Sequence, residues 1–214
     1  MTPNEQLIRN PMGYLSLQTM PIREELREYY AQKYFQEDSG NYAKQYSKEE
    51  LQNKKEKFEF INLSNVLEHV IDPVEILKTF QTLLAKHALL RVCIPNDYSL
   101  YQDFLVQKNY TTDTWFSPPD HLHYFTFESL HRLFLSLGYK IVIEMGDFPI
   151  ELYLANPTSN SYTARQKAKD AHTARVEVDN FLFSHGRDKY IDFYKASASI
   201  GLSRQIIIYA RVLS

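Results

Sequence analysis

The sequence predicts an α/β fold with a sheet of about four strands, N-terminal helices before the sheet and a helical insertion before its last strand. The main observation is a short apolar run, an amphipathic helix and a second apolar run within residues 58–94, which is the length of one strand–helix–strand unit. A helix and a strand follow at 126–145, and a last apolar run occupies 204–212. We therefore expect the first two runs to pair in parallel, with both later strands on the side of the second run.

Length, charge and cysteine content limit the function classes. The chain has 214 residues, enough for a sizeable core, and its formal net charge of −2 gives no basic surface for nucleic acid or anionic membrane. Cys93 is the only cysteine, so no intrachain disulfide can form. No apolar stretch approaches the roughly 20 residues that span a bilayer, and the N-terminus lacks the pattern of a signal peptide. We expect a cytoplasmic protein that binds neither nucleic acid nor membrane.

Residues 1–57 are expected to form an N-terminal leader with helices. Prolines and little periodicity predict an irregular chain over 1–22, and the charged and aromatic stretch 23–36 suits an amphipathic helix. Polar residues around Gly40 end that helix. The segment 47–58, which is charged nearly all round, predicts a second, solvated helix.

Residues 58–146 are expected to form the α/β core. The run from 58 to 63 has the composition of a buried parallel strand. Asp72 is a suitable N-cap for the next helix, and Pro73 suits its first position. A second apolar run over 88–94 ends at a proline.

The rest of the chain repeats this pattern more loosely. A long aromatic loop is expected after the second strand, followed by a helix that Thr126 opens and Gly138 closes, and by a strand over 139–145. Residues 147–202 are expected to be a helical insertion with two helices. Residues 203–214 then hold the last strand of the core.

Polar side chains gather where the first two strands end. Loops that follow parallel strands open at the carboxyl edge of a sheet, which is where open α/β sheets bind ligands. The segment before Thr126 must return over the same edge. The side chains that we expect to converge there are Asn65, Glu68, His69, Asn96, Asp97, Asp120, His121, His123 and Tyr124.

The histidines allow more than one interpretation. His69 can take a proton from a hydroxyl or amine nucleophile near neutral pH, or Glu68 and His69 can brace the helix that follows. Asp120, His121 and His123 would suit a metal-dependent hydrolase. Because no further ligand with suitable spacing is evident, we expect no metal site.

Together these segments resemble the class I S-adenosylmethionine-dependent methyltransferases, closest to the bacterial branch found with surface-glycan and small-molecule modification genes. The resemblance rests on FINLSNVLEHVIDPVEILKTFQTLL, LLRVCIPND and PPDHLHYFTFESLHRLFLSLGYKIV. These are similar to the family's fourth strand and helix, its fifth strand, and the next helix with the sixth strand. RQIIIYARV resembles the seventh, antiparallel strand, and YYAQKYFQ the helix that closes over the cofactor. The resemblance implies a Rossmann-like methyltransferase sheet.

The resemblance also implies a reaction and a site. The reaction is methyl transfer from S-adenosylmethionine to an oxygen, nitrogen or carbon atom of a small molecule or glycan precursor. The residues that would line the remaining cofactor wall are Ser64, Asn65 and Val66. The residues that would face the acceptor are His69, His121, His123 and Tyr124, with His69 removing a proton where one must leave.

The sequence departs from the family at the cofactor loop. The family carries a glycine-rich loop after its first strand, whereas no glycine lies between Gly40 and Gly138. Glycine lets a backbone approach a ligand, so we expect a reduced sheet without strands one to three, and weak or no cofactor binding. The strand at 58–63 would then be a sheet edge that the N-terminal helices or a second copy of the chain must cover. The alternative to an enzyme is a non-catalytic remnant that acts as an interaction or regulatory protein.

Overall fold

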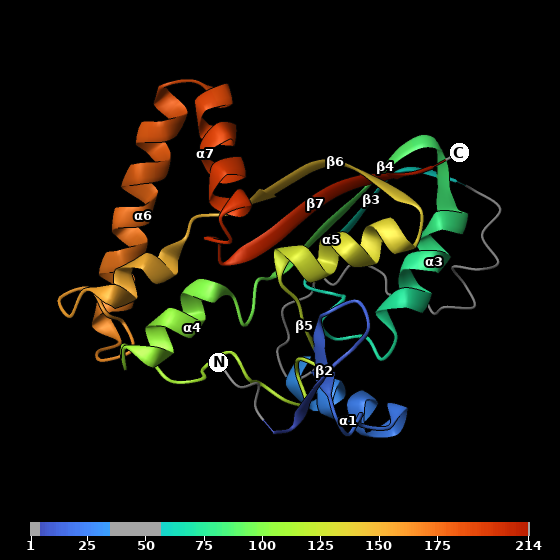
Figure 1. The fold of residues 1–214 in the computed structure, drawn as a ribbon, viewed down its shortest axis with the longest axis horizontal. Coiled ribbons are helices and arrows are strands. Elements are labelled where there is room, and N and C mark those ends of the chain that lie inside the picture. The colour runs from blue at the N-terminus through green and yellow to red at the C-terminus, as the bar shows by residue number, and fades with distance from the viewer. Residues whose placement is uncertain (1–4, 35–56, 214) are drawn as a thin grey trace.

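The computed structural model describes residues 5–34 and 57–213, which form two β-sheets with helices around them (Figure 1). The larger sheet has the strand order β3-β4-β7-β6, and the smaller has the order β1-β2-β5. The strands are β1 (Leu7–Arg9), β2 (Leu15–Leu17), β3 (Phe58–Ser64), β4 (Leu84–Pro95), β5 (His123–Tyr124), β6 (Tyr139–Gly146) and β7 (Gln205–Val212). The helices are α1 (Arg23–Tyr34), α3 (Pro73–Leu83), α4 (Leu100–Gln107), α5 (Phe127–Ser136), η1 (Ile150–Ala155), α6 (Gln166–Ser184) and α7 (Arg187–Ser199).

The larger sheet confirms the predicted strand–helix–strand unit. β3 and β4 pair in parallel, with Ser64 opposite Cys93, and α3 connects them. β7 pairs antiparallel with β4, and β6 pairs antiparallel with β7. Both later strands therefore lie on the β4 side, as predicted, and β3 is an edge strand among the described residues.

Local capping fixes the two helices that pack on this sheet. The carboxylate of Asp72 accepts the backbone N–H of Glu75 at 2.9 Å, which caps α3. Thr126 and Ser129 form a reciprocal cap at the start of α5. Gly138 follows α5 with a φ of +76°, a left-handed conformation that suits glycine after a helix. These helix boundaries agree with the sequence prediction.

The main core lies between α3, α5 and one face of the larger sheet. The hydroxyl of Tyr139, a fully buried residue, donates to the backbone carbonyl of Leu77 at 2.7 Å and so ties β6 to α3. Burying one large apolar side chain contributes about 1.5–3 kcal/mol to the free energy of folding. This core therefore holds the sheet and its carboxyl edge in place. Its members with no exposed surface are Leu67, Leu77, Leu90, Val92, Ile94, Leu130, Leu133, Phe134, Tyr139, Ile206, Ile208 and Ala210.

The prediction of an irregular leader over 1–22 was wrong, because its described part holds the β1–β2 hairpin. The side-chain oxygen of Asn10 accepts the backbone N–H groups of Met12 at 2.8 Å and Gly13 at 3.1 Å. Gly13 completes the turn with a φ of +95°. Strands of three residues are too short to show the alternation of apolar and polar residues that identifies a strand. In addition, β2 pairs with β5, which is distant in the sequence.

The predicted long loop over 96–125 was also wrong in part, because it contains α4 and β5. Ser99 and Gln102 cap α4 through two reciprocal hydrogen bonds, a pattern that the sequence carries as S-x-x-Q. β4 begins at Leu84, directly after α3, rather than at Ala88.

The small sheet forms a second core with α1. Leu26 of α1 packs there with Leu7, Leu15, Leu17, Leu122 and Tyr124. The helix predicted over 23–36 is confirmed up to Tyr34. The helix predicted over 47–58 lies outside the described residues, except for its last two positions.

The predicted helical insertion between β6 and β7 contains η1, α6 and α7. α6 and α7 form a helical hairpin at one end of the larger sheet (Figure 1), and the hydroxyl of Tyr194 in α7 donates to Asp179 in α6. The domain boundaries themselves remain predictions. Within the described ranges, no helix combines the length and apolar character needed to cross a membrane.

Candidate functional site

Backbone hydrogen bonds join the loops after β3 and β4 to the segment before α5. The N–H groups of Leu122 and His123 donate to the Glu68 carbonyl at 2.7 and 3.2 Å. The N–H of Asp97 donates to the Phe125 carbonyl at 2.9 Å. The three segments therefore meet at the carboxyl edge of the sheet, as the order of the strands predicted.

The ring of His69 is held in one orientation and one tautomer. Its Nδ1 atom lies 2.5 Å from the backbone carbonyl oxygen of Asp120, and the hydroxyl of Tyr30 on α1 lies 3.3 Å from the same nitrogen. A carbonyl can only accept, so we assign the hydrogen to Nδ1. The neutral ring then carries its lone pair on Nε2, which lies 3.7 Å from Oε1 of Glu68.

His121 lies beside His69, with 5.0 Å between the ring centroids. Its Nδ1 atom is 3.6 Å from Oδ2 of Asp97. The other carboxylate oxygen of Asp97 accepts a hydrogen bond from Arg204 at 2.7 Å. Arg204 therefore balances the charge of the buried Asp97 carboxylate, which in turn lies where it can orient His121.

Glu68 is buried within this cluster, with 2% of its surface exposed. Neither of its carboxylate oxygens has a hydrogen-bond partner among the described residues. Burial raises the pKa of Glu68 to about 7, because the charged form loses its hydration. Buried polar groups are normally hydrogen-bonded, so this carboxyl group marks a place where a proton or a cation can bind.

His123 and Tyr124 contact other partners. The Nδ1 atom of His123 lies 2.8 Å from Oγ of Ser16, and its Nε2–H donates to the Val70 carbonyl at 2.9 Å. Burial lowers the pKa of His123. The Tyr124 hydroxyl donates to the His121 carbonyl at 3.2 Å, and burial raises its pKa to about 12. Both side chains hold this segment in place, and their roles toward an acceptor remain predictions.

The residues predicted to line the cofactor wall follow β3 at the edge of the sheet. Ser64 and Asn65 are exposed, and Val66 is half-buried. Asn65 has a φ of +53°, and its N–H donates to the Cys93 carbonyl at 2.8 Å. No residue from 57 to 137 is a glycine that could form the cradle for the methionine end of the cofactor. Among the described residues, Ser64, Asn65 and Val66 could line one side of S-adenosylmethionine, and this role remains a prediction.

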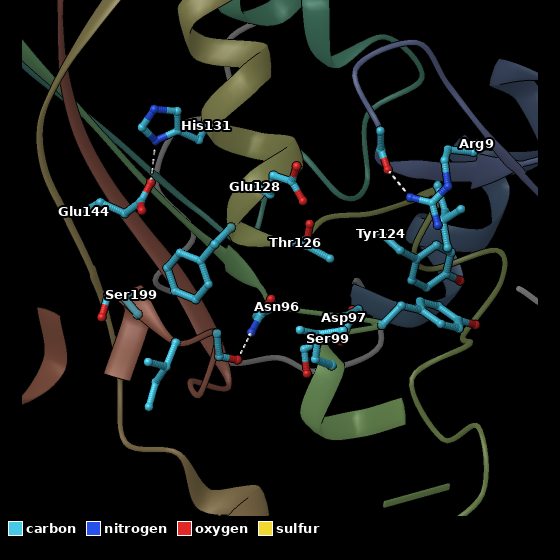
Figure 2. Close-up of a pocket in the computed structure, with 18 residues that line it drawn as sticks. Arg9, Asn96, Asp97, Ser99, Tyr124, Thr126, Glu128, His131, Glu144 and Ser199 are labelled. Atoms are coloured by element: carbon cyan, nitrogen blue, oxygen red, sulfur yellow. Dashed lines mark hydrogen bonds and ion pairs between the residues drawn. The ribbon is translucent and has the colours of Figure 1, made fainter. Parts of the chain in front are cut away.

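A cavity of about 610 Å³ lies between the start of α5 and the loop after β4 (Figure 2). Asp97 and Tyr124 line it and also contact His121, so the cavity and the cluster share a boundary although His69 and His121 do not line the cavity. Its volume is in the range of small-molecule sites. Its other polar lining residues surround the start of α5 and the loop after β4, and include Arg9, Asn96, Ser99, Thr126, Glu128, His131, Glu144 and Ser199.

A polar network next to Asp97 was not predicted from the sequence. Oε1 of Glu151 accepts hydrogen bonds from Gln102 and Trp115, each at 2.9 Å. The same oxygen lies 3.7 Å from Nε of Arg204. These residues come from distant segments and share no local motif. The sequence indicated only the place of Gln102, through the S-x-x-Q capping pattern at the start of α4.

Comparison with known families identifies the fold. The model of the methyltransferase domain family matches residues 15–144, more than half of the chain. The chain belongs to the class I S-adenosylmethionine-dependent methyltransferase family. No curated protein gives a significant match. The matched residues run from β2 into β6 and include all three segments that form the histidine cluster of this methyltransferase.

The family assignment accounts for the sheet. The order β3-β4-β7-β6, with β7 antiparallel to both neighbours, agrees with a reduced Rossmann-like methyltransferase sheet, as the sequence predicted. S-adenosylmethionine is the typical cofactor of the family. For this methyltransferase, the acceptor and the residues that act on it remain predictions.

Proposed function

We propose that this chain transfers a methyl group from S-adenosylmethionine to an oxygen, nitrogen or carbon atom of a small molecule or glycan precursor. The observation that carries the proposal is the orientation of His69. Its Nδ1–H is held by the Asp120 carbonyl at 2.5 Å, so Nε2 is the nitrogen that can take a proton. A base positioned at the carboxyl edge of the sheet can deprotonate a hydroxyl or amine acceptor as the methyl group arrives.

The neighbouring residues would position the acceptor for this step. His121, whose Nδ1 lies 3.6 Å from Oδ2 of Asp97, can hydrogen-bond an acceptor oxygen. His123 uses both ring nitrogens inside the fold, so we propose that it acts by holding the segment that carries His121. Tyr124 would act in the same way through the His121 carbonyl. Most of the catalysis would then come from positioning.

The cavity, which His69 does not line, would hold the unreactive part of a small hydroxylated acceptor. It combines the aromatic rings of Tyr98, Tyr124 and Phe127 with the carboxylates of Glu128 and Glu144. Aromatic faces pack against apolar surfaces, and carboxylates accept hydrogen bonds from hydroxyl groups. A sugar or another polyhydroxylated small molecule has both kinds of surface.

The cofactor would lie against the loop after β3. Ser64, Asn65 and Val66 would hold one side of it, and S-adenosylmethionine when bound supplies an electrophilic methyl group. Since the described residues offer no glycine cradle for its methionine end, we propose weak binding, with a Kd above about 10 μM, which corresponds to roughly 7 kcal/mol.

The second candidate is a non-catalytic remnant that acts as an interaction or regulatory protein. Two observations favour it. Glycine is missing from 57–137, and β3 is an edge strand among the described residues, with Phe60 51% exposed. An apolar strand edge invites pairing with another chain, so a second copy covering β3 would fit this function.

Incubation with methyl-labelled S-adenosylmethionine distinguishes the proposed methyltransferase from the proposed non-catalytic remnant. The acceptors would be hydroxylated small molecules, amines and sugar nucleotides. The enzyme is supported by labelled product and by formation of S-adenosylhomocysteine above the level without acceptor, both lost in His69→Ala. Absence of product with every acceptor, together with absence of cofactor binding, would support the remnant.

A further inference from the structure

Three side chains with metal-binding groups meet beside the cavity: Glu68 and His69 after β3, and His121 before β5. One ligand atom from each lies within 4.8 Å of the other two. We propose that Glu68, His69 and His121 bind one divalent first-row transition ion of the zinc class. Two imidazoles and one carboxylate are donors that such ions prefer, and three protein ligands leave a coordination position open.

The state of Glu68 is the observation that points to a cation. The residue is 2% exposed, and within residues 5–34 and 57–213 neither carboxylate oxygen has a hydrogen-bond partner. A carboxylate removed from water without a donor is strongly unfavourable. An ion bound by its oxygens would supply the missing partner, whereas a merely structural carboxyl group would be expected to accept hydrogen bonds.

His69 has the geometry of a metal ligand whose second ring nitrogen is already hydrogen-bonded to the protein. Ligating histidines usually donate their second ring N–H to a carbonyl or carboxylate, and Nδ1 of His69 lies 2.5 Å from the Asp120 carbonyl. Its Nε2 atom lies 3.7 Å from Oε1 of Glu68. That distance is too long for a hydrogen bond, but two ligand atoms about 2.1 Å from one ion at a tetrahedral angle are about 3.4 Å apart.

The charges around the cluster also favour a cation. Asp120 Oδ1 lies 3.8 Å from Nδ1 of His69, and Asp97 Oδ2 lies 3.6 Å from Nδ1 of His121. Asp97 is paired with Arg204, so it supports His121 rather than serving as a ligand. His123, which the sequence grouped with His121 and Asp120 as a metal set, has both nitrogens engaged elsewhere. The proposed ligand set therefore differs from the one that the sequence suggested.

Direct metal titration of the full chain, without an affinity tag and after treatment with a chelator, tests the site. Zinc(II) in competition with a chromophoric chelator, and cobalt(II) followed by its visible absorption, are expected to show one site per chain. Glu68→Gln and His121→Ala are each expected to weaken binding at least tenfold. Glu68→Gln keeps the shape of the side chain, and circular dichroism would verify that both variants fold.

His131→Ala is the matched control, because His131 also pairs with a carboxylate, Glu144 at 3.0 Å, outside the cluster. It is expected to leave zinc affinity unchanged. Absence of saturable uptake of either ion by the unchanged chain would overturn the proposal, and so would a Glu68→Gln chain that binds zinc as tightly. The titration contains neither cofactor nor acceptor, so its outcome does not depend on whether the chain transfers methyl groups.

Discussion

The Nδ1 nitrogen of His69 lies 2.5 Å from the backbone carbonyl oxygen of Asp120. This contact joins the loop after β3 to the segment before β5 and assigns the ring hydrogen to Nδ1. The sequence left two roles for His69 as alternatives, a base or a brace for the next helix. The structure shows that the ring contacts the segment before β5, and both roles remain predictions.

Replacement of His69 by alanine is expected to affect activity much more than stability. Loss of a general base lowers turnover by about 10²–10⁴. Loss of one hydrogen bond to Asp120 lowers the free energy of unfolding by about 1 kcal/mol. Rates of S-adenosylhomocysteine formation and thermal unfolding curves measure the two effects.

Asp72→Ala is the control for that experiment. It removes the N-cap of α3 and should destabilise the chain by about 1 kcal/mol, with turnover unchanged. A His69→Ala chain that keeps full turnover would show that His69 serves only as a brace.

Glu68→Gln is expected to stabilise the metal-free chain at high pH. The pKa of Glu68 is raised from 4.5 to about 7 on folding, so the folded chain holds this proton more tightly than the unfolded chain does. The contribution of Glu68 to stability is therefore full below pH 4.5 and is lost as the pH rises through about 7. In the presence of a chelator, the stability gained by Glu68→Gln should increase by roughly 2–3 kcal/mol between about pH 5 and pH 8. An equal gain at both pH values would contradict the raised pKa.

Arg204→Gln is expected to destabilise the chain and lower its activity. Arg204 donates to the buried Asp97 at 2.7 Å, and a charge-assisted hydrogen bond of this kind contributes about 1.5–3 kcal/mol. Without it Asp97 would no longer orient His121. Arg132→Gln is the matched control, because Arg132 pairs with the exposed Glu128 and such pairs contribute about 0–1 kcal/mol. Equal unfolding midpoints for the two variants in urea would refute this role of Arg204.

Zinc is expected to inhibit methyl transfer if both proposals for His69 hold. One lone pair on Nε2 cannot bind an ion and take a proton at once. Turnover should therefore fall as the Glu68, His69 and His121 site fills, with the same midpoint as the direct zinc titration. Turnover that rises with zinc would show that His69 is not the base.

The elements with complete local signals could be predicted from the sequence. Asp72, Thr126 and Gly138 mark helix ends through contacts within a few residues, and the apolar runs of β4 and β7 predict buried strands correctly. The prediction that the strand at 58–63 is buried was wrong, because β3 is an edge strand in which only Leu63 is buried. The β1–β2 hairpin gave no such signal, because its strands have three residues each and β2 depends on β5.

The candidate site could be predicted in position but not in detail. The order of strands is enough to bring His69, His121 and Asp97 to one edge. The burial of Glu68, the pairing of Asp97 with Arg204 and the inward orientation of His123 depend on contacts between residues far apart in the chain. No local sequence pattern predicts such contacts. The proposed metal ligands could therefore not be assigned from the spacing of residues in the sequence.

Calorimetric titration with S-adenosylmethionine and with its demethylated product tests the proposed function most directly. We predict saturable binding of both, with a Kd above about 10 μM, because the loop after β3 offers one wall of the site without a glycine cradle. Asn65→Ala should weaken it further, since Asn65 has a φ of +53° that alanine adopts poorly. A chain that shows no saturable heat with either compound would contradict a cofactor-dependent enzyme.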